Sequence, residues 1–178
     1  MKMIYQNVYS IKNFHKFNKK DKSKFIKIIL DDKDKFFTKM GYDIAILENV
    51  NLRDSDYTKI LYDKFLKLSQ KKFGPFNLLE NNSTICYSLI TNEDNYASVP
   101  HNHIDTSIIN SVYYLSVPHQ KGEIQFFIDN EWLNYQPEEN ELLIFPNYIE
   151  HNTTKNNTKE WRISINMEIM CDFDWDKL

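Results

Sequence analysis

The sequence predicts an α+β fold in which two N-terminal helices buttress a β-rich jelly roll. Two observations support this prediction. In the first 80 residues, apolar side chains recur at helical spacing in two stretches. After Pro75, seven or eight short β-branched and aromatic segments are separated by turns every 8–12 residues or so, as in sandwiches and barrels. With no internal repeat and no linker, we expect a single domain, 1–178, in which 1–80 supports a core formed by 81–170.

The composition restricts the class of protein. Hydrophobic residues make up 42% and aromatic residues 15%, which is typical of a globular chain. No apolar run approaches the roughly 18–20 residues that span a bilayer, and the N-terminus lacks a hydrophobic signal core. Two cysteines do not indicate a disulfide framework. We therefore expect a cytoplasmic protein without a membrane partner.

Charge is distributed unevenly along the chain. Residues 1–80 hold 17 Lys and Arg against 10 Asp and Glu, whereas residues 81–178 hold 5 against 15. A basic segment can bind nucleic acid, but here the lysines alternate with acidic residues along helix-like patterns. This alternation favours solvated helix faces, so we do not expect nucleic acid to be a partner.

The first half of the chain contains one predicted strand and two predicted helices. Residues 3–11 are rich in aromatic and β-branched side chains and predict an opening strand. The periodicity over 22–40 predicts the first helix. Asp54 or Ser55 can cap the second helix, which ends before Gly74. We expect both helices to pack against one face of a sheet.

The second half reads as a series of strands. They are predicted at 84–90, 108–117, 123–128, 132–135, 141–145, 148–153 and 161–170. Four of their aromatic residues are expected in the core: Phe126, Phe127, Trp132 and Trp161.

The segment Pro100-His101-Asn102-His103-Ile104-Asp105 concentrates potential metal ligands. Residues two apart on a strand share a face, so either His101 with His103 or His103 with Asp105 could present two ligands to one ion. His151 is the obvious third ligand. Two histidines and a carboxylate on one face of the metal are the usual ligand set of a mononuclear non-haem Fe(II) oxygenase. We interpret this cluster as a catalytic iron site.

A second group of candidate residues follows on the last strand. Arg162 and Ser164 share a face, and an arginine inside a small roll needs a partner for its charge. A dicarboxylate co-substrate would provide one, gripped by the guanidinium and hydrogen-bonded by Ser164. Tyr114, on the strand after the histidines, could add a hydroxyl group.

These segments together resemble a known superfamily. Pro-His-Asn-His, Ser-Val-Tyr-Tyr-Leu, Glu-Leu-Leu-Ile-Phe-Pro-Asn-Tyr-Ile-Glu-His and Trp-Arg-Ile-Ser-Ile-Asn are similar to the 2-oxoglutarate/Fe(II)-dependent oxygenases, in a small bacterial and phage branch related to prolyl hydroxylases. The similarity covers roughly residues 83–169. It implies a double-stranded β-helix fold, with Fe(II) and 2-oxoglutarate as cofactors and O2 as co-substrate.

The resemblance also implies roles for individual residues. His151 corresponds to the distal metal ligand, and Arg162 with Ser164 to the co-substrate clamp. The superfamily's His-x-Asp pair fits His103 and Asp105, whereas the His-x-His pair of the smaller branch fits His101 and His103. We favour the set with Asp105, because an aspartate balances the charge of Fe(II).

The function implied is a dioxygenase that hydroxylates a C–H bond of a prolyl or other amino-acid or peptide unit. Succinate and CO2 would be the co-products. Two alternatives stay open on the sequence alone. One is a cupin-type metalloenzyme with three histidine ligands, and the other is a non-catalytic β-roll binding module. The sequence names no substrate, because specificity in such sites resides in loops around the mouth.

Overall fold

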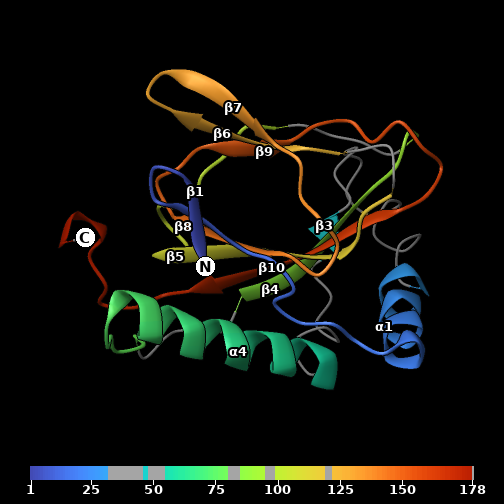
Figure 1. Ribbon diagram of the computed structural model, residues 1–178, viewed down its shortest axis with the longest axis horizontal. Coiled ribbons are helices and arrows are strands. Elements are labelled where there is room, and N and C mark those ends of the chain that lie inside the picture. The colour runs from blue at the N-terminus through green and yellow to red at the C-terminus, as the bar shows by residue number, and fades with distance from the viewer. Residues whose placement is uncertain (32–45, 48–54, 80–84, 95–98, 119–121, 178) are drawn as a thin grey trace.

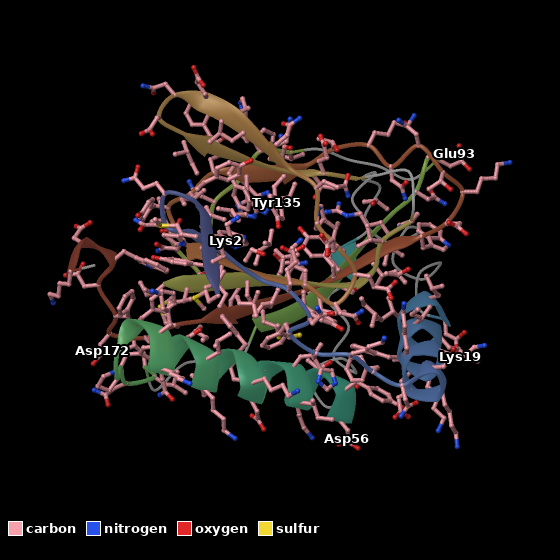
Figure 2. All side chains as sticks on the ribbon, viewed as in Figure 1. Lys2, Lys19, Asp56, Glu93, Tyr135 and Asp172 are labelled. Atoms are coloured by element: carbon pink, nitrogen blue, oxygen red, sulfur yellow. The ribbon has the colours of Figure 1, made fainter. Side chains whose placement is uncertain are left out.

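A computed structural model describes residues 1–31, 46–47, 55–79, 85–94, 99–118 and 122–177. Two antiparallel sheets face each other, and helices lie outside the larger one (Figure 1). Side chains from both sheets occupy the space between them (Figure 2). This is the jelly-roll arrangement that the sequence predicts.

Within the described residues, the larger sheet has seven strands. In spatial order they are β1 (Lys2–Tyr5), β2 (Val8–Ile11), β8 (Leu142–Pro146), β5 (Ile109–Ser116), β10 (Arg162–Ile169), β4 (Ile85–Thr91) and β3 (Ile46–Leu47). The smaller sheet has three strands, in the order β7 (Glu131–Tyr135), β6 (Ile124–Ile128) and β9 (His151–Thr153). The chain ends in a short 3-10 helix, η1 (Trp175–Lys177).

Two described helices cover the outer face of the larger sheet. They are α1 (Lys19–Asp31) and α4 (Asp56–Phe73), and α4 runs along the underside of the sheet in Figure 1. The hydroxyl of Ser55 accepts a hydrogen bond from the backbone N–H of Tyr57, so Ser55 is the N-cap. Leu61 and Phe65 of α4 are fully buried against the sheet, which follows from their helical i, i+4 spacing.

Strand β10 shows how the core is divided. All eight of its residues are buried, because both faces of the sheet are covered. Ile163, Ile165, Met167 and Ile169 belong to the hydrophobic cluster on the helix side. By strand alternation, the polar residues Arg162, Ser164, Asn166 and Glu168 face the space between the two sheets. A polar stripe therefore runs along the inside of the roll.

Most of the predicted elements are confirmed within a few residues, and three expectations are corrected. The strand predicted at 3–11 is a hairpin, because the chain turns at Asn7 with a φ of 57° and separates β1 from β2. Helix α1 begins at Lys19, three residues before the predicted start, and the predicted part beyond Asp31 lies outside the described residues. The division of 1–178 into a supporting part and a core stays a prediction.

The third correction concerns the aromatic core. Phe126 is buried as predicted, and Trp161 is half-buried against the core. Phe127 and Trp132, however, are 37% and 39% exposed. They face each other across β6 and β7 and pack ring against ring on the outer side of the smaller sheet.

Among the described helices, none is long and apolar enough to cross a membrane.

Candidate metal centre and its cavity

The backbone places His101 directly beside His151. The N–H of His101 donates to the carbonyl of His151 at 3.1 Å, and the N–H of His151 donates to the carbonyl of His101 at 2.9 Å. This isolated antiparallel bridge extends the smaller sheet beyond β9. Two residues paired in this way project their side chains to the same face. His101 is therefore brought to His151 by sheet geometry.

His103 follows on the same face, and the chain then turns away. The N–H of His103 donates to the carbonyl of Asn147 at 2.8 Å. The carbonyl of His103 then accepts from the N–H groups of Thr106 and Ser107, which closes a turn. Asp105 lies in this turn with an exposed side chain. The i, i+2 alternation that would bring Asp105 beside His103 ends at this turn.

The three imidazole rings form one compact group. One ring nitrogen of each residue lies within 4.8 Å of those of the other two, and this group could hold a metal ion. The ring centres are 4.4 Å apart for His101 and His151, 5.1 Å for His101 and His103, and 5.2 Å for His103 and His151. Asp105 is not part of this group. The geometry thus disagrees with our preference for Asp105 and favours the alternative, His-x-His set.

Hydrogen bonds determine which nitrogen each ring presents. His101 Nδ1 lies 2.9 Å from the carbonyl oxygen of Val99, and His151 Nδ1 lies 3.1 Å from that of Ile149. His103 Nδ1 lies 3.2 Å from a carboxylate oxygen of Glu168. A carbonyl oxygen can only accept, so His101 and His151 each carry a proton on Nδ1. In each ring Nε2 keeps the lone pair that a metal requires, and the donor set fits a metal ion.

Burial favours the neutral form of two of these rings. Burial lowers the pKa of His151 well below its ordinary value, and the neighbouring His101 and His103 add to this effect. Burial also lowers the pKa of His101, although the carbonyl of Val99 opposes the shift. Neutral imidazole is the form that binds metals. Both rings are therefore ready to act as ligands near neutral pH.

A cavity of about 230 Å³ extends from the histidines into the roll. His101 and His151 line it, and so do Arg162 and Ser164. Tyr114 of β5 contributes to the same lining. Every site residue predicted from the sequence except Asp105 and His103 lines this cavity. His103 does not line it but belongs to the same histidine group as His101 and His151.

Arg162 is 3% exposed and held by close packing. The central carbon of its guanidinium lies 5.2 Å from the centre of the Tyr114 ring, within cation–π distance. The side chain also passes over Gly122, where an added Cβ would lie only 2.9 Å from Arg162 Cδ. Glycine at this position therefore leaves space for the arginine.

Ser164 and Tyr114 face each other across neighbouring strands. They are paired in the β5–β10 register, and both are buried. Burial raises the pKa of Tyr114 above its ordinary value, although the nearby Arg162 opposes this shift. The phenol therefore keeps its proton and remains able to donate a hydrogen bond into the cavity.

Three residues that sequence reasoning did not assign belong to this site. Asn166 lines the cavity, Gly122 packs against Arg162, and Glu168 contacts His103. The alternation that pairs Arg162 with Ser164 also predicts Asn166 and Glu168 on the same face. That signal was present in the sequence. Nothing local indicated Gly122, because its contact with Arg162 exists only in the folded chain.

Sequence comparison identifies one related family. The profile of a family described as "Putative 2OG-Fe(II) oxygenase" matches residues 128–168. This segment includes His151, Arg162, Ser164 and Glu168. No curated protein sequence matches the chain.

Structural comparison finds similar folds in two prolyl 4-hydroxylases and in HygX. The chain aligns with a prolyl 4-hydroxylase from Phytophthora capsici at a TM-score of 0.66 and 13% identity, covering 93% of this chain and 59% of that chain. It aligns with a prolyl 4-hydroxylase from Pseudomonas putida at a TM-score of 0.61 and 13% identity, covering 92% of each. HygX from Streptomyces hygroscopicus, whose structure holds nickel and 2-oxoglutarate, gives a TM-score of 0.63 at 12% identity and covers 90% of this chain and 81% of that chain.

These comparisons confirm the resemblance recognised in the sequence. The fold is shared with the two prolyl 4-hydroxylases and with HygX, and over residues 128–168 the chain is similar to the family described as "Putative 2OG-Fe(II) oxygenase". The expected bacterial or phage origin is not shown by them.

Proposed function

We propose that this protein is a 2-oxoglutarate/Fe(II)-dependent dioxygenase that hydroxylates a C–H bond of a prolyl or other amino-acid or peptide unit. In the overall reaction, one oxygen atom of O2 enters the substrate hydroxyl and the other enters succinate, which forms from 2-oxoglutarate with loss of CO2. The observation that carries this proposal is one cavity lined by two members of the histidine group, His101 and His151, and by the buried Arg162. The prolyl unit is suggested by the two prolyl 4-hydroxylases of similar fold.

We assign the metal to His101, His103 and His151. Their Nδ1 atoms face oxygen acceptors, and one ring nitrogen of each lies within 4.8 Å of the others. Three ligands on one side of an ion leave positions open for co-substrate and O2, as an oxygenase requires. Bound iron would supply the oxygen activation.

The protein's own residues bind and orient 2-oxoglutarate. Arg162 would pair with the distal carboxylate, because a guanidinium and a carboxylate form two parallel hydrogen bonds. Ser164 and the protonated Tyr114 would donate further hydrogen bonds to the same group. Burial of Arg162, Ser164 and Tyr114 keeps water away from this end of the cavity and strengthens each interaction.

A three-histidine cupin-type metalloenzyme is the second candidate function. It is favoured by the observation that no carboxylate is part of the histidine group among the described residues. Such an enzyme has no need of a buried arginine that lines the cavity. Dependence of turnover on 2-oxoglutarate separates the two functions.

The test measures succinate formed from 2-oxoglutarate in the presence of Fe(II), with and without prolyl peptides and free amino acids. We expect slow succinate formation with protein and cofactors alone, and faster formation with a true substrate. The Arg162→Ala variant should bind Fe(II) as the wild type does but lose 2-oxoglutarate affinity. A metal-loaded wild type that forms no succinate under any of these conditions would overturn the proposal.

A further inference from the structure

Two buried carboxylates lie inside the fold, and they are held very differently. Glu141 is completely buried and accepts hydrogen bonds from Ser10, Lys12, Tyr135 and the backbone N–H of Glu138. Glu168 is 4% exposed, and its only ion-pair partner within the described part of the chain is His103. A buried carboxylate is costly unless its oxygens are paired. The network around Glu141 compensates this cost, whereas the surroundings of Glu168 do so only in part.

The second oxygen of Glu168 has no hydrogen-bond partner among the residues described. Directly across the β5–β10 pair lies Asn110, whose Nδ2 is also buried and without a partner in the described structure. Ser107 donates to Asn110 Oδ1 at 2.6 Å, which leaves Nδ2 as the amide atom available to a neighbour. Glu168 Oε2 can accept a hydrogen bond and Asn110 Nδ2 can donate one. Because the two residues face each other on adjacent strands, a small side-chain adjustment would allow them to bond.

Glu168 and His103 also differ in how firmly the backbone holds them. Glu168 is on a strand paired on both sides, with Asn110 of β5 and with Ile85 of β4. His103 precedes a turn and lies outside the named strands. The carboxylate is therefore the fixed member of the pair, and the imidazole is the member that it can orient.

We propose that Glu168 is the positioning carboxylate of the metal centre, acting through His103 Nδ1 and supplying the negative charge that a three-histidine ligand set lacks. This inference rests on the proposed function, in particular on metal binding by the three histidines. A carboxylate behind a metal-bound histidine fixes the tautomer, orients the ring and increases the basicity of the ligating nitrogen. Glu168 thereby takes over the charge-balancing role for which we favoured Asp105.

Two substitutions separate charge from orientation. Glu168→Gln keeps an oxygen that can accept from His103 Nδ1 but removes the charge. Glu168→Met removes both in a side chain of similar length, and it is expected to fold because it replaces a buried carboxylate by an apolar group. Affinity for Co(II), measured by competition with a chelator, should decrease from wild type to Gln to Met, with the Met variant about 10–100-fold weaker.

The Co(II) absorption spectrum provides a second readout that a merely structural role would not change. Loss of the carboxylate partner of His103 should shift the visible bands of the bound Co(II) in both variants. Glu141→Gln is the matched control, since it alters a buried carboxylate outside the histidine group. It should lower thermal stability while leaving Co(II) affinity and spectrum unchanged.

The outcomes separate this inference from the proposed function. Wild-type affinity and an unchanged spectrum in both Glu168 variants would overturn the role of Glu168, even if the enzyme forms succinate normally. An affinity loss in Glu141→Gln equal to that in Glu168→Gln would also overturn it, because a general effect of buried charge would then explain both. A wild-type protein that binds neither Co(II) nor Fe(II) would overturn the proposed function itself.

Discussion

Two groups of residues at the cavity are built differently, and we call them the arginine end (Arg162, Ser164 and Tyr114) and the histidine end (His101, His103 and His151). The arginine end is carried by paired strands: Arg162 and Ser164 lie on β10, and Tyr114 lies on the adjacent β5. The histidine end depends on an isolated bridge between His101 and His151 and on a turn after His103. Regular strands place side chains by simple alternation, whereas a bridge and a turn place them by contacts far apart in the sequence. The position of a residue on a paired strand is thus easier to predict than the membership of a ligand set.

The largest expected effect tests the histidine end. His101→Ala should lower Fe(II) or Co(II) affinity by more than the roughly 10–100-fold typical of losing an outer hydrogen-bond partner, because it removes a proposed ligand. Asp105→Ala is the matched control, because Asp105 is exposed in the turn and should leave metal affinity unchanged. If instead Asp105→Ala weakens metal binding and His101→Ala binds metal as tightly as the wild type, the ligand set that we favoured from the sequence would be restored.

The next effect tests the packing of the arginine end. In Gly122→Ala the new Cβ would lie 2.9 Å from Arg162 Cδ, so the arginine must shift. We expect 2-oxoglutarate affinity to fall about tenfold, or ~1.4 kcal/mol, with metal affinity unchanged. In an Arg162→Ala background the same substitution should have no further effect. An equal loss in both backgrounds would show that Gly122 acts independently of Arg162.

A smaller effect tests the hydroxyl group at the same end. Tyr114→Phe removes one hydrogen-bond donor from the cavity and should weaken 2-oxoglutarate binding by about 1 kcal/mol. Tyr113→Phe is the control. The hydroxyl of Tyr113 donates a hydrogen bond to the carbonyl of His15 at 2.8 Å, and Tyr113 belongs to the helix-side core. Isothermal titration of both variants should show weaker 2-oxoglutarate binding only for Tyr114→Phe. If Tyr113→Phe weakens it equally, Tyr114 has no specific role.

The smallest effect is a pH dependence of the metal-free protein. Burial lowers the folded-state pKa of His151, so below the ordinary histidine value of about 6.5 the unfolded chain binds a proton that the folded chain does not. The contribution of this group to stability should therefore be constant well above pH 6.5 and decrease as the pH falls through this value, by less than about 1 kcal/mol at pH 6. Urea melts of chelator-treated protein across this range measure the trend, and His151→Gln should weaken it. A stability that rises on acidification would contradict the assigned pKa shift.

The sequence by itself determined the fold class and the arginine end of the site. Period-two alternation and turn spacing predicted the strands of the roll, and the same alternation predicts which β10 residues face the cavity. The family profile match over 128–168 lies in this regular part of the chain. These features depend on neighbours along the chain, so local patterns are sufficient to predict them.

Only the tertiary structure decided which carboxylate and which histidines lie close together. Alternation continues only as far as the strand conformation does, and the turn after His103 removes Asp105 from the shared face. His101 is placed instead by its hydrogen bonds with His151, 50 positions further along the chain. The carboxylate near the histidines is Glu168, on a strand that reaches His103 only when the roll closes. Contacts between distant segments set this geometry, and a linear pattern does not encode them.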